Sequence, residues 1–93
     1  MSKIYQGQAN VVISIDTGVS LGGASETKIL YQKPNGLKGS WIATVTGTTM
    51  SYVPSNTDLD QSGDWQLQAF AVIGGKNALG EVIKMIVNKP LNI

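Results

Sequence analysis

The sequence predicts an all-β protein, folded as an antiparallel sandwich or barrel of about seven strands. Apolar residues recur at every second position in short segments, which is the period of a half-buried strand. Glycine, proline, asparagine and serine separate these segments, and no stretch shows a sustained helical apolar period. A chain of 93 residues has the length of a single domain with one modest core.

Seven segments carry the alternation. In chain order they are 3–7 (KIYQG), 10–16 (NVVISID), 26–34 (ETKILYQKP), 40–47 (SWIATVTG), 48–54 (TTMSYVP), 64–73 (DWQLQAFAVI) and 80–90 (GEVIKMIVNKP). Pro34, Pro54 and Pro90 end three of them, because proline cannot donate a hydrogen bond to a strand ladder. Hairpin turns are expected in KPNGLKG, TGTT and IGGKNALG, and a loop between sheets in TGVSLGGASE. The inward positions of the alternation predict a core of Ile13, Ile15, Ile29, Tyr31, Trp41, Val45, Tyr52, Trp65 and Leu67.

Composition argues against several functions. All seven basic residues are lysines scattered along a chain of net charge +1, so a nucleic-acid-binding surface is not expected. Cysteine is absent, which removes disulfides and thiolate chemistry. The first residues, MSKIYQGQ, lack the apolar segment of a secretory signal, and no apolar run is long enough to cross a bilayer. A soluble protein made in the cytoplasm, without a membrane partner, is therefore expected.

The stretch DLDQSGDWQLQAF (58–70) has two interpretations, and the first is a metal-binding loop. Its acidic residues make weak candidate ligands: Asp58, Asp60 and Asp64. Alternate carboxylates followed by a glycine, Gly63, resemble the start of a calcium loop. The position that should hold a bidentate glutamate is Ala69, and a strand pattern follows in place of a helix. We therefore expect no bound metal or cofactor.

The second interpretation, which we prefer, is a corner that leads into a strand. Asp60 is expected to cap the turn through its side chain, and Gly63 to adopt a positive φ. The stretch resembles the E–F corner of immunoglobulin-like sandwiches, with Trp65 in the place of the corner tyrosine and Leu67 in that of the cysteine. We expect that the indole does not reproduce the hydrogen bond of the tyrosine hydroxyl. The resemblance implies an immunoglobulin-like antiparallel β-sandwich.

No catalytic constellation is recognisable. The chain has no histidine or cysteine, and no serine lies in a nucleophile motif. The acidic residues fall near turns or in polar contexts, which favours solvated surface over acid–base pairs: Asp16, Glu26, Asp58, Asp60, Asp64 and Glu81. The glycine-rich segments GVSLGG and GGKNALG complete no phosphate-loop motif. An enzyme is not expected.

Two groups of residues are candidates for binding. Trp41 and Trp65 could stack on a sugar if exposed, but each begins an alternating segment, which favours a core role. Phe70 and Val72 lie on the face opposite Trp65, as Ile42 lies opposite Trp41. They form either an exposed apolar strip for a partner protein or, if the long strand twists, a second buried face. Asn77, in a loop, is the further candidate contact.

The order of these features resembles the small immunoglobulin-like structural proteins of tailed-bacteriophage virions and the N-terminal domains of some phage baseplate proteins. The likeness spans about residues 4–90 and rests on the KPNG turn after Tyr31, the WIATV strand and DLDQSGDWQLQA. It implies a non-enzymatic accessory protein of the capsid, neck, tail or baseplate, located in the virion, made in the host cytoplasm and bound to other virion proteins. Such a component is expected in many copies or as a homo-oligomer. The alternative is a carbohydrate-binding or adhesion module that aids attachment to a host surface.

Overall fold

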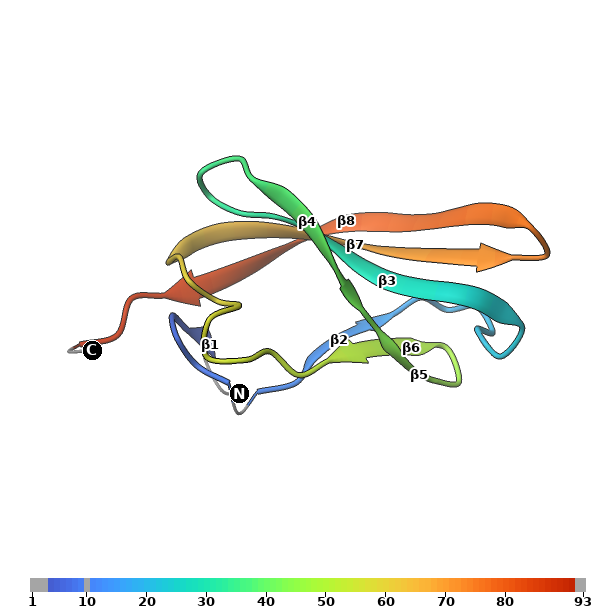
Figure 1. The fold of residues 1–93 in the computed structure, drawn as a ribbon, viewed down its shortest axis with the longest axis horizontal. Helices are drawn as coiled ribbons and strands as arrows, with labels where there is room; N and C mark the ends of the chain where they lie inside the picture. The colour runs from blue at the N-terminus through green and yellow to red at the C-terminus, as the bar shows by residue number, and fades with distance from the viewer. Residues whose placement is uncertain (1–3, 10, 92–93) are drawn as a thin grey trace.

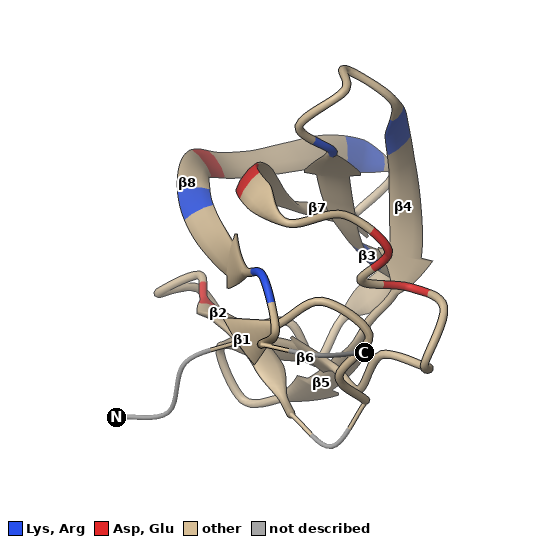
Figure 2. Ribbon diagram, turned by 90° about the vertical axis from the view of Figure 1, so that its left-hand side faces the viewer, with Lys and Arg blue, Asp and Glu red and all other residues tan. Residues whose placement is uncertain are grey.

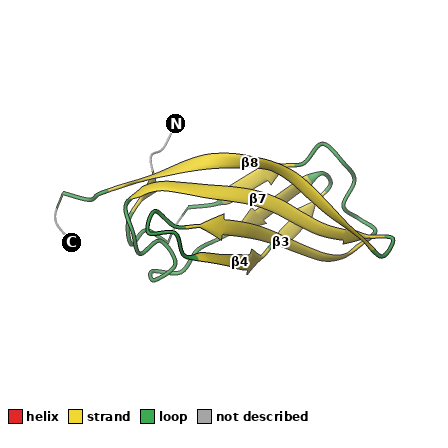
Figure 3. Ribbon diagram, turned by 90° about the horizontal axis from the view of Figure 1, so that it is seen from above, coloured by secondary structure: helices red, strands yellow, loops and turns green. Residues whose placement is uncertain are grey.

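The computed structural model describes residues 4–9 and 11–91, and it is built from strands and loops (Figure 3). Its eight strands are β1 (Ile4–Tyr5), β2 (Ile13–Asp16), β3 (Ala24–Gln32), β4 (Lys38–Ile42), β5 (Thr44–Thr46), β6 (Thr49–Tyr52), β7 (Gly63–Ile73) and β8 (Lys76–Asn88). No helix occurs among the described residues. The all-β prediction is thus confirmed.

The strands form two sheets that lie face to face (Figure 1). One sheet has five strands in the order β1-β8-β7-β3-β4, and the other has three in the order β2-β6-β5. All neighbours pair antiparallel except β1, which runs parallel to the end of β8. The side chains between the two layers make the core, as expected for a β-sandwich.

The segment predicted as one strand over 40–47 is divided between the sheets at Ala43. Its first part, β4, pairs with β3, whereas its second part, β5, pairs with β6. Thr27 of β3 makes two hydrogen bonds with Ala43, each of 3.1 Å. The Thr27 carbonyl accepts from the Ala43 amide, and the Thr27 hydroxyl donates to the Ala43 carbonyl. This segment passes from the upper layer to the lower in Figure 1 and closes one side of the sandwich.

The core is a single cluster. Its buried members include Ile13, Ile15, Ile29, Trp41, Trp65 and Leu67, and Tyr31, Val45 and Tyr52 pack against them while partly exposed. Four aromatic rings meet at one end of it. The Trp41 ring stacks on Tyr52 with centroids 4.8 Å apart, and the Tyr31 ring lies 4.6 Å from Trp41 and 5.6 Å from Trp65.

The last hairpin is longer than the alternation predicts. β8 begins at Lys76 and not at Gly80, and β7 and β8 are joined by the two-residue turn Gly74–Gly75. A bulge interrupts the pairing, because the partners of Gln68 and Phe70 on β8 are Val82 and Leu79. The extra residue breaks the period of two, so the first part of β8 is out of phase with the second.

Candidate functional site

The three acidic candidates of the corner are held apart by different partners. Asp58 accepts from the Tyr52 hydroxyl at 2.6 Å and from the Ser55 amide at 2.7 Å. The other two carboxylates each face a lysine: Lys33 at 2.9 Å from Asp60, and Lys84 at 3.5 Å from Asp64. Among residues 4–9 and 11–91 no three acidic side chains are grouped as metal ligands would be. The corner is therefore organised by internal hydrogen bonds and ion pairs.

Asp58, and not Asp60, caps the turn at this corner. Its carboxylate receives the Ser55 amide three residues earlier, while Asp60 reaches across to Lys33 on the β3–β4 loop. Burial alone would raise the pKa of Asp58, but the hydrogen bonds from Tyr52 and Ser55 and the charge of Lys33 together hold that pKa below its usual value. The hydrogen bond to Asp58, together with burial, raises the pKa of the Tyr52 hydroxyl to about 12. The prediction for Asp60 was wrong because it considered only neighbours in sequence.

The prediction that the indole leaves the corner bond unmade was also wrong. The Nε1–H of Trp65 donates to the backbone carbonyl of Gln61 at 3.0 Å. An indole N–H is a donor, as a tyrosine hydroxyl is, so it can fasten the corner to the strand in the same way. Gly63 has a φ of 127°, and a Cβ there would lie 3.0 Å from Cγ of Pro34. The positive φ therefore favours glycine at this position, and the close approach of the Pro34 side chain adds to that preference.

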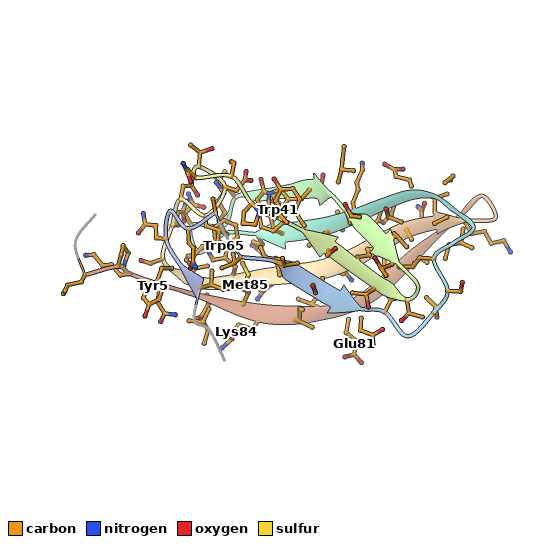
Figure 4. The ribbon with its side chains drawn as sticks, turned by 90° about the horizontal axis from the view of Figure 1, so that it is seen from below. Tyr5, Trp41, Trp65, Glu81, Lys84 and Met85 are labelled. Atoms are coloured by element: carbon orange, nitrogen blue, oxygen red, sulfur yellow. The ribbon has the colours of Figure 1, made fainter. Side chains whose placement is uncertain are left out.

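Neither tryptophan offers a face for stacking on a sugar. Trp41 is 6% exposed and Trp65 is 0% exposed. Figure 4 shows both indoles between the layers, toward one end of the sandwich. The aromatic platform considered for a carbohydrate ligand is absent at these two positions.

The structure brings the four predicted contact residues onto the outer face of the larger sheet. Residues that pair directly across antiparallel strands point to the same side. Pairing runs from Ile42 through Lys28 to Phe70 in one row, and joins Val72 to Asn77 in the next. Ile42 is 81% exposed, Asn77 is exposed, and Phe70 and Val72 are half-buried.

Three further apolar residues belong to this face and were missed by sequence reasoning. Leu79 pairs with Phe70, Val82 pairs with Gln68, and Leu30 pairs with Gln68 from the other side. We call the whole set the outer patch: Leu30, Ile42, Phe70, Val72, Leu79 and Val82. The bulge explains the omission, because Leu79 and Val82 are three residues apart and a strict period of two would place them on opposite faces.

The outer patch continues into a shallow groove of about 570 Å³ on the same face. Its lining includes Leu30 and Val82 of the patch, followed by polar residues of three neighbouring strands: Gln32, Lys38, Ser40, Gln66 and Gln68. Charged residues of both signs are dispersed over strands and loops and are not gathered on one face (Figure 2). The outer face thus combines apolar side chains with polar surroundings that include the charged residues Glu26, Lys28 and Lys38. An apolar cluster with a polar surround is the composition of a protein-binding surface.

Comparison of the chain with protein-family models, with curated proteins and with solved structures found no match. Within residues 4–9 and 11–91 there is no helix that could span a membrane.

Proposed function

We propose that this chain is a non-enzymatic protein-interaction module with an immunoglobulin-like sandwich, and that it serves as a structural accessory protein of a tailed-bacteriophage particle. The assignment to a virion comes from the sequence resemblance, and the partners it implies are other virion proteins contacted by many copies. The observation that carries the interaction role is the outer patch, an apolar surface on the exposed face of a sheet.

The order of the strands supports the immunoglobulin-like part of the proposal. In that arrangement strands B, E and D form one sheet, and G, F and C form the other. The orders β2-β6-β5 and β8-β7-β3 correspond to these two sets, with β4 as the additional strand beside C. The Trp65 to Gln61 hydrogen bond occupies the place of the tyrosine corner at the start of strand F.

The interaction role can be tested by site-specific crosslinking. A photoreactive amino acid is placed at Ile42, in the outer patch, and in a second variant at Val53, which is exposed but lies in the loop after β6. Particles that contain either variant are purified and irradiated. We expect adducts with another virion protein from position 42 and none from position 53.

Two outcomes would contradict the proposal. One is the absence of the protein from purified particles, detected by mass spectrometry, which would remove the virion role. The other is equal crosslinking from positions 42 and 53, which would show that the outer patch is not the contact surface. The Ile42→Lys variant should fold normally, because its side chain is 81% exposed.

A further inference from the structure

Among the residues that the structure describes, one long edge of β8 has no strand partner. On one side β8 pairs with β7 from Lys76 to Val87, but on the other side β1 covers only Val87 and Asn88. Over 76–86 no described strand lies along that edge. In the smaller sheet β2 pairs only with β6, so its opposite edge is also open among the described residues.

The direction of the backbone groups on this edge follows from the β1 contact. The carbonyl of Asn88 points toward the first segment, because it accepts the Gln6 amide at 2.9 Å. N–H and C=O groups alternate sides along a strand, so those of Ile86, Lys84 and Val82 point to the same open side. Within the described part of the chain no strand occupies these donors and acceptors, so they can pair with a strand that lies beside them.

A groove of about 710 Å³ lies between these two open edges. Its apolar lining includes Ile13 of β2 and Val12 just before it, together with Ile83, Met85 and Ile86 of β8. Among the described residues Lys84 is the one charged residue that lines it. In Figure 4 Lys84 and Glu81 lie along the outer margin of β8, and Met85 lies on the side of β8 toward β2. Val12 and Ile86 are 62% and 57% exposed, so a large part of this apolar surface contacts water.

We propose that this groove is an acceptor for one extended segment of a partner protein, which pairs with the open edge of β8 as an added strand. The segment carries apolar side chains at alternate positions, which enter the groove between β8 and β2, and polar side chains between them. β1 already uses the same edge in this way at Val87 and Asn88, so the added strand continues an existing line of pairing. The groove and the outer patch are separate surfaces, and this inference does not depend on the first proposal.

A second copy of the chain does not fit as the occupant. Two copies could pair β8 with β8, but Met85 and Val87 would stay in their own cores and leave the groove unfilled. The same holds for β4, an edge strand of the larger sheet, whose inward residue Trp41 is buried. The occupant must come from a segment whose side chains are not already packed in a sheet.

The test uses the full chain and a synthetic peptide, acetyl-KTVTVTVTK-amide, with NMR of the labelled protein. We expect saturable shifts of the Val82, Lys84 and Ile86 amides and slower hydrogen exchange at these positions. N-methylation of every second peptide residue, in one of the two possible sets, removes the N–H groups that face β8 and should abolish binding. The other set should bind like the parent peptide.

A pair of variants separates the contribution of the Lys84 backbone N–H from that of its side chain. Lys84→Pro removes an N–H that points to the open edge and not to β7, whereas Lys84→Ala removes only the side chain. We expect Lys84→Pro to weaken peptide binding by about tenfold or more and Lys84→Ala to change it by less than about threefold. If Lys84→Pro does not fold, the two N-methylated peptides still decide the question on the native chain.

The proposal is overturned by any of three results. They are the absence of shifts at these three amides, equal binding of the two N-methylated peptides, and self-association by sedimentation that Lys84→Pro abolishes, which would assign the edge to a second copy. Ile42→Lys should leave peptide binding unchanged, so failure here and failure of the outer-patch proposal are distinguishable.

Discussion

The indole Nε1–H of Trp65 donates to the backbone carbonyl of Gln61 at 3.0 Å, four residues earlier in the chain. The ring is fully buried and lies in the aromatic cluster with Tyr31 and Trp41. One side chain therefore fills the core and also fixes the direction from which the 54–62 loop enters β7. Since the chain has no cysteine, this bond and the packing around it hold the corner without a disulfide.

Trp65→Phe should lower the free energy of unfolding by about 1–3 kcal/mol. Phenylalanine retains most of the apolar contact but leaves a void and removes the donor to the Gln61 carbonyl. Urea unfolding followed by far-ultraviolet circular dichroism measures the change. Gln61→Ala is the control, because it keeps the backbone carbonyl and loses only the long, exposed hydrogen bond from the Asn35 amide to the Gln61 side chain at 3.3 Å. It should cost less than about 0.5 kcal/mol. Equal losses in both variants would mean that the indole bond is not what holds the corner.

Stability should fall at both ends of the pH range through the bond between Tyr52 and Asp58. The pKa of Asp58 is lowered in the folded chain from a reference value of 3.8, so its contribution is present above that value and is lost as pH falls below it. The pKa of Tyr52 is raised from 10.0 to about 12, so its contribution is present below pH 10.0 and is lost as pH rises toward 12. Both shifts include the same Tyr52–Asp58 hydrogen bond, so the two contributions must not be added.

Tyr52→Phe removes this bond, so the loss of stability at alkaline pH should disappear. The loss at acid pH should become smaller but persist, because Ser55 and Lys33 still favour the charged form of Asp58. We expect a loss of about 1 kcal/mol at pH 7, since the pair is only partly buried. Urea unfolding at a series of pH values measures the profile, and absorbance at alkaline pH follows tyrosine ionisation, from which the phase near pH 12 should disappear. An alkaline phase that persists in Tyr52→Phe would assign it to another tyrosine.

The alternation of the sequence predicts the two-layer β fold but not the places where a strand changes its partner. Nothing in the pattern marks Ala43, because Trp41, Ala43 and Val45 alternate without interruption while the strand moves from one sheet to the other. What divides the strand is contact with Thr27, which is distant in sequence. Tertiary contacts of this kind cannot be derived from a local period.

The candidate binding surfaces could also be predicted only in part from the local period of the sequence. Ile42, Phe70 and Val72 could be placed on an outer face from periodicity alone. The contributions of Leu79 and Val82 depend on a bulge, which shifts the phase without any change in residue type. The open edge of β8 depends on how few residues of β1 pair with it, and this is a property of the topology.

Lys33 should contribute modestly to stability, in a way that depends on salt. Its Nζ lies 2.9 Å from one Asp60 oxygen and 5.8 Å from the centre of the Trp65 ring, and its side chain is largely covered. Lys33→Met keeps the apolar stem and should cost about 0.5–1 kcal/mol in low salt, and less in molar salt. Lys84→Met is the matched control, because its pair with Asp64 is exposed and spans 3.5 Å, and it should change stability little. A loss in Lys33→Met that salt does not reduce would point to packing in place of charge.

Gly39→Ala should destabilise the fold even though the backbone of Gly39 needs no positive φ. A Cβ at this position would collide with the hydroxyl end of Tyr31, the residue that pairs with Gly39 across β3 and β4. The Tyr31 ring cannot move freely, because it is packed 4.6 Å from Trp41 and 5.6 Å from Trp65. We expect the free energy of unfolding, measured in urea, to fall by about 1–3 kcal/mol, with red-shifted tryptophan emission if the aromatic cluster opens.

Gly22→Ala is the control, since a Cβ there has no atom within 4 Å, and its effect should stay within about 0.5 kcal/mol. Equal stability of the two variants would show that the aromatic cluster can repack around a larger residue at position 39.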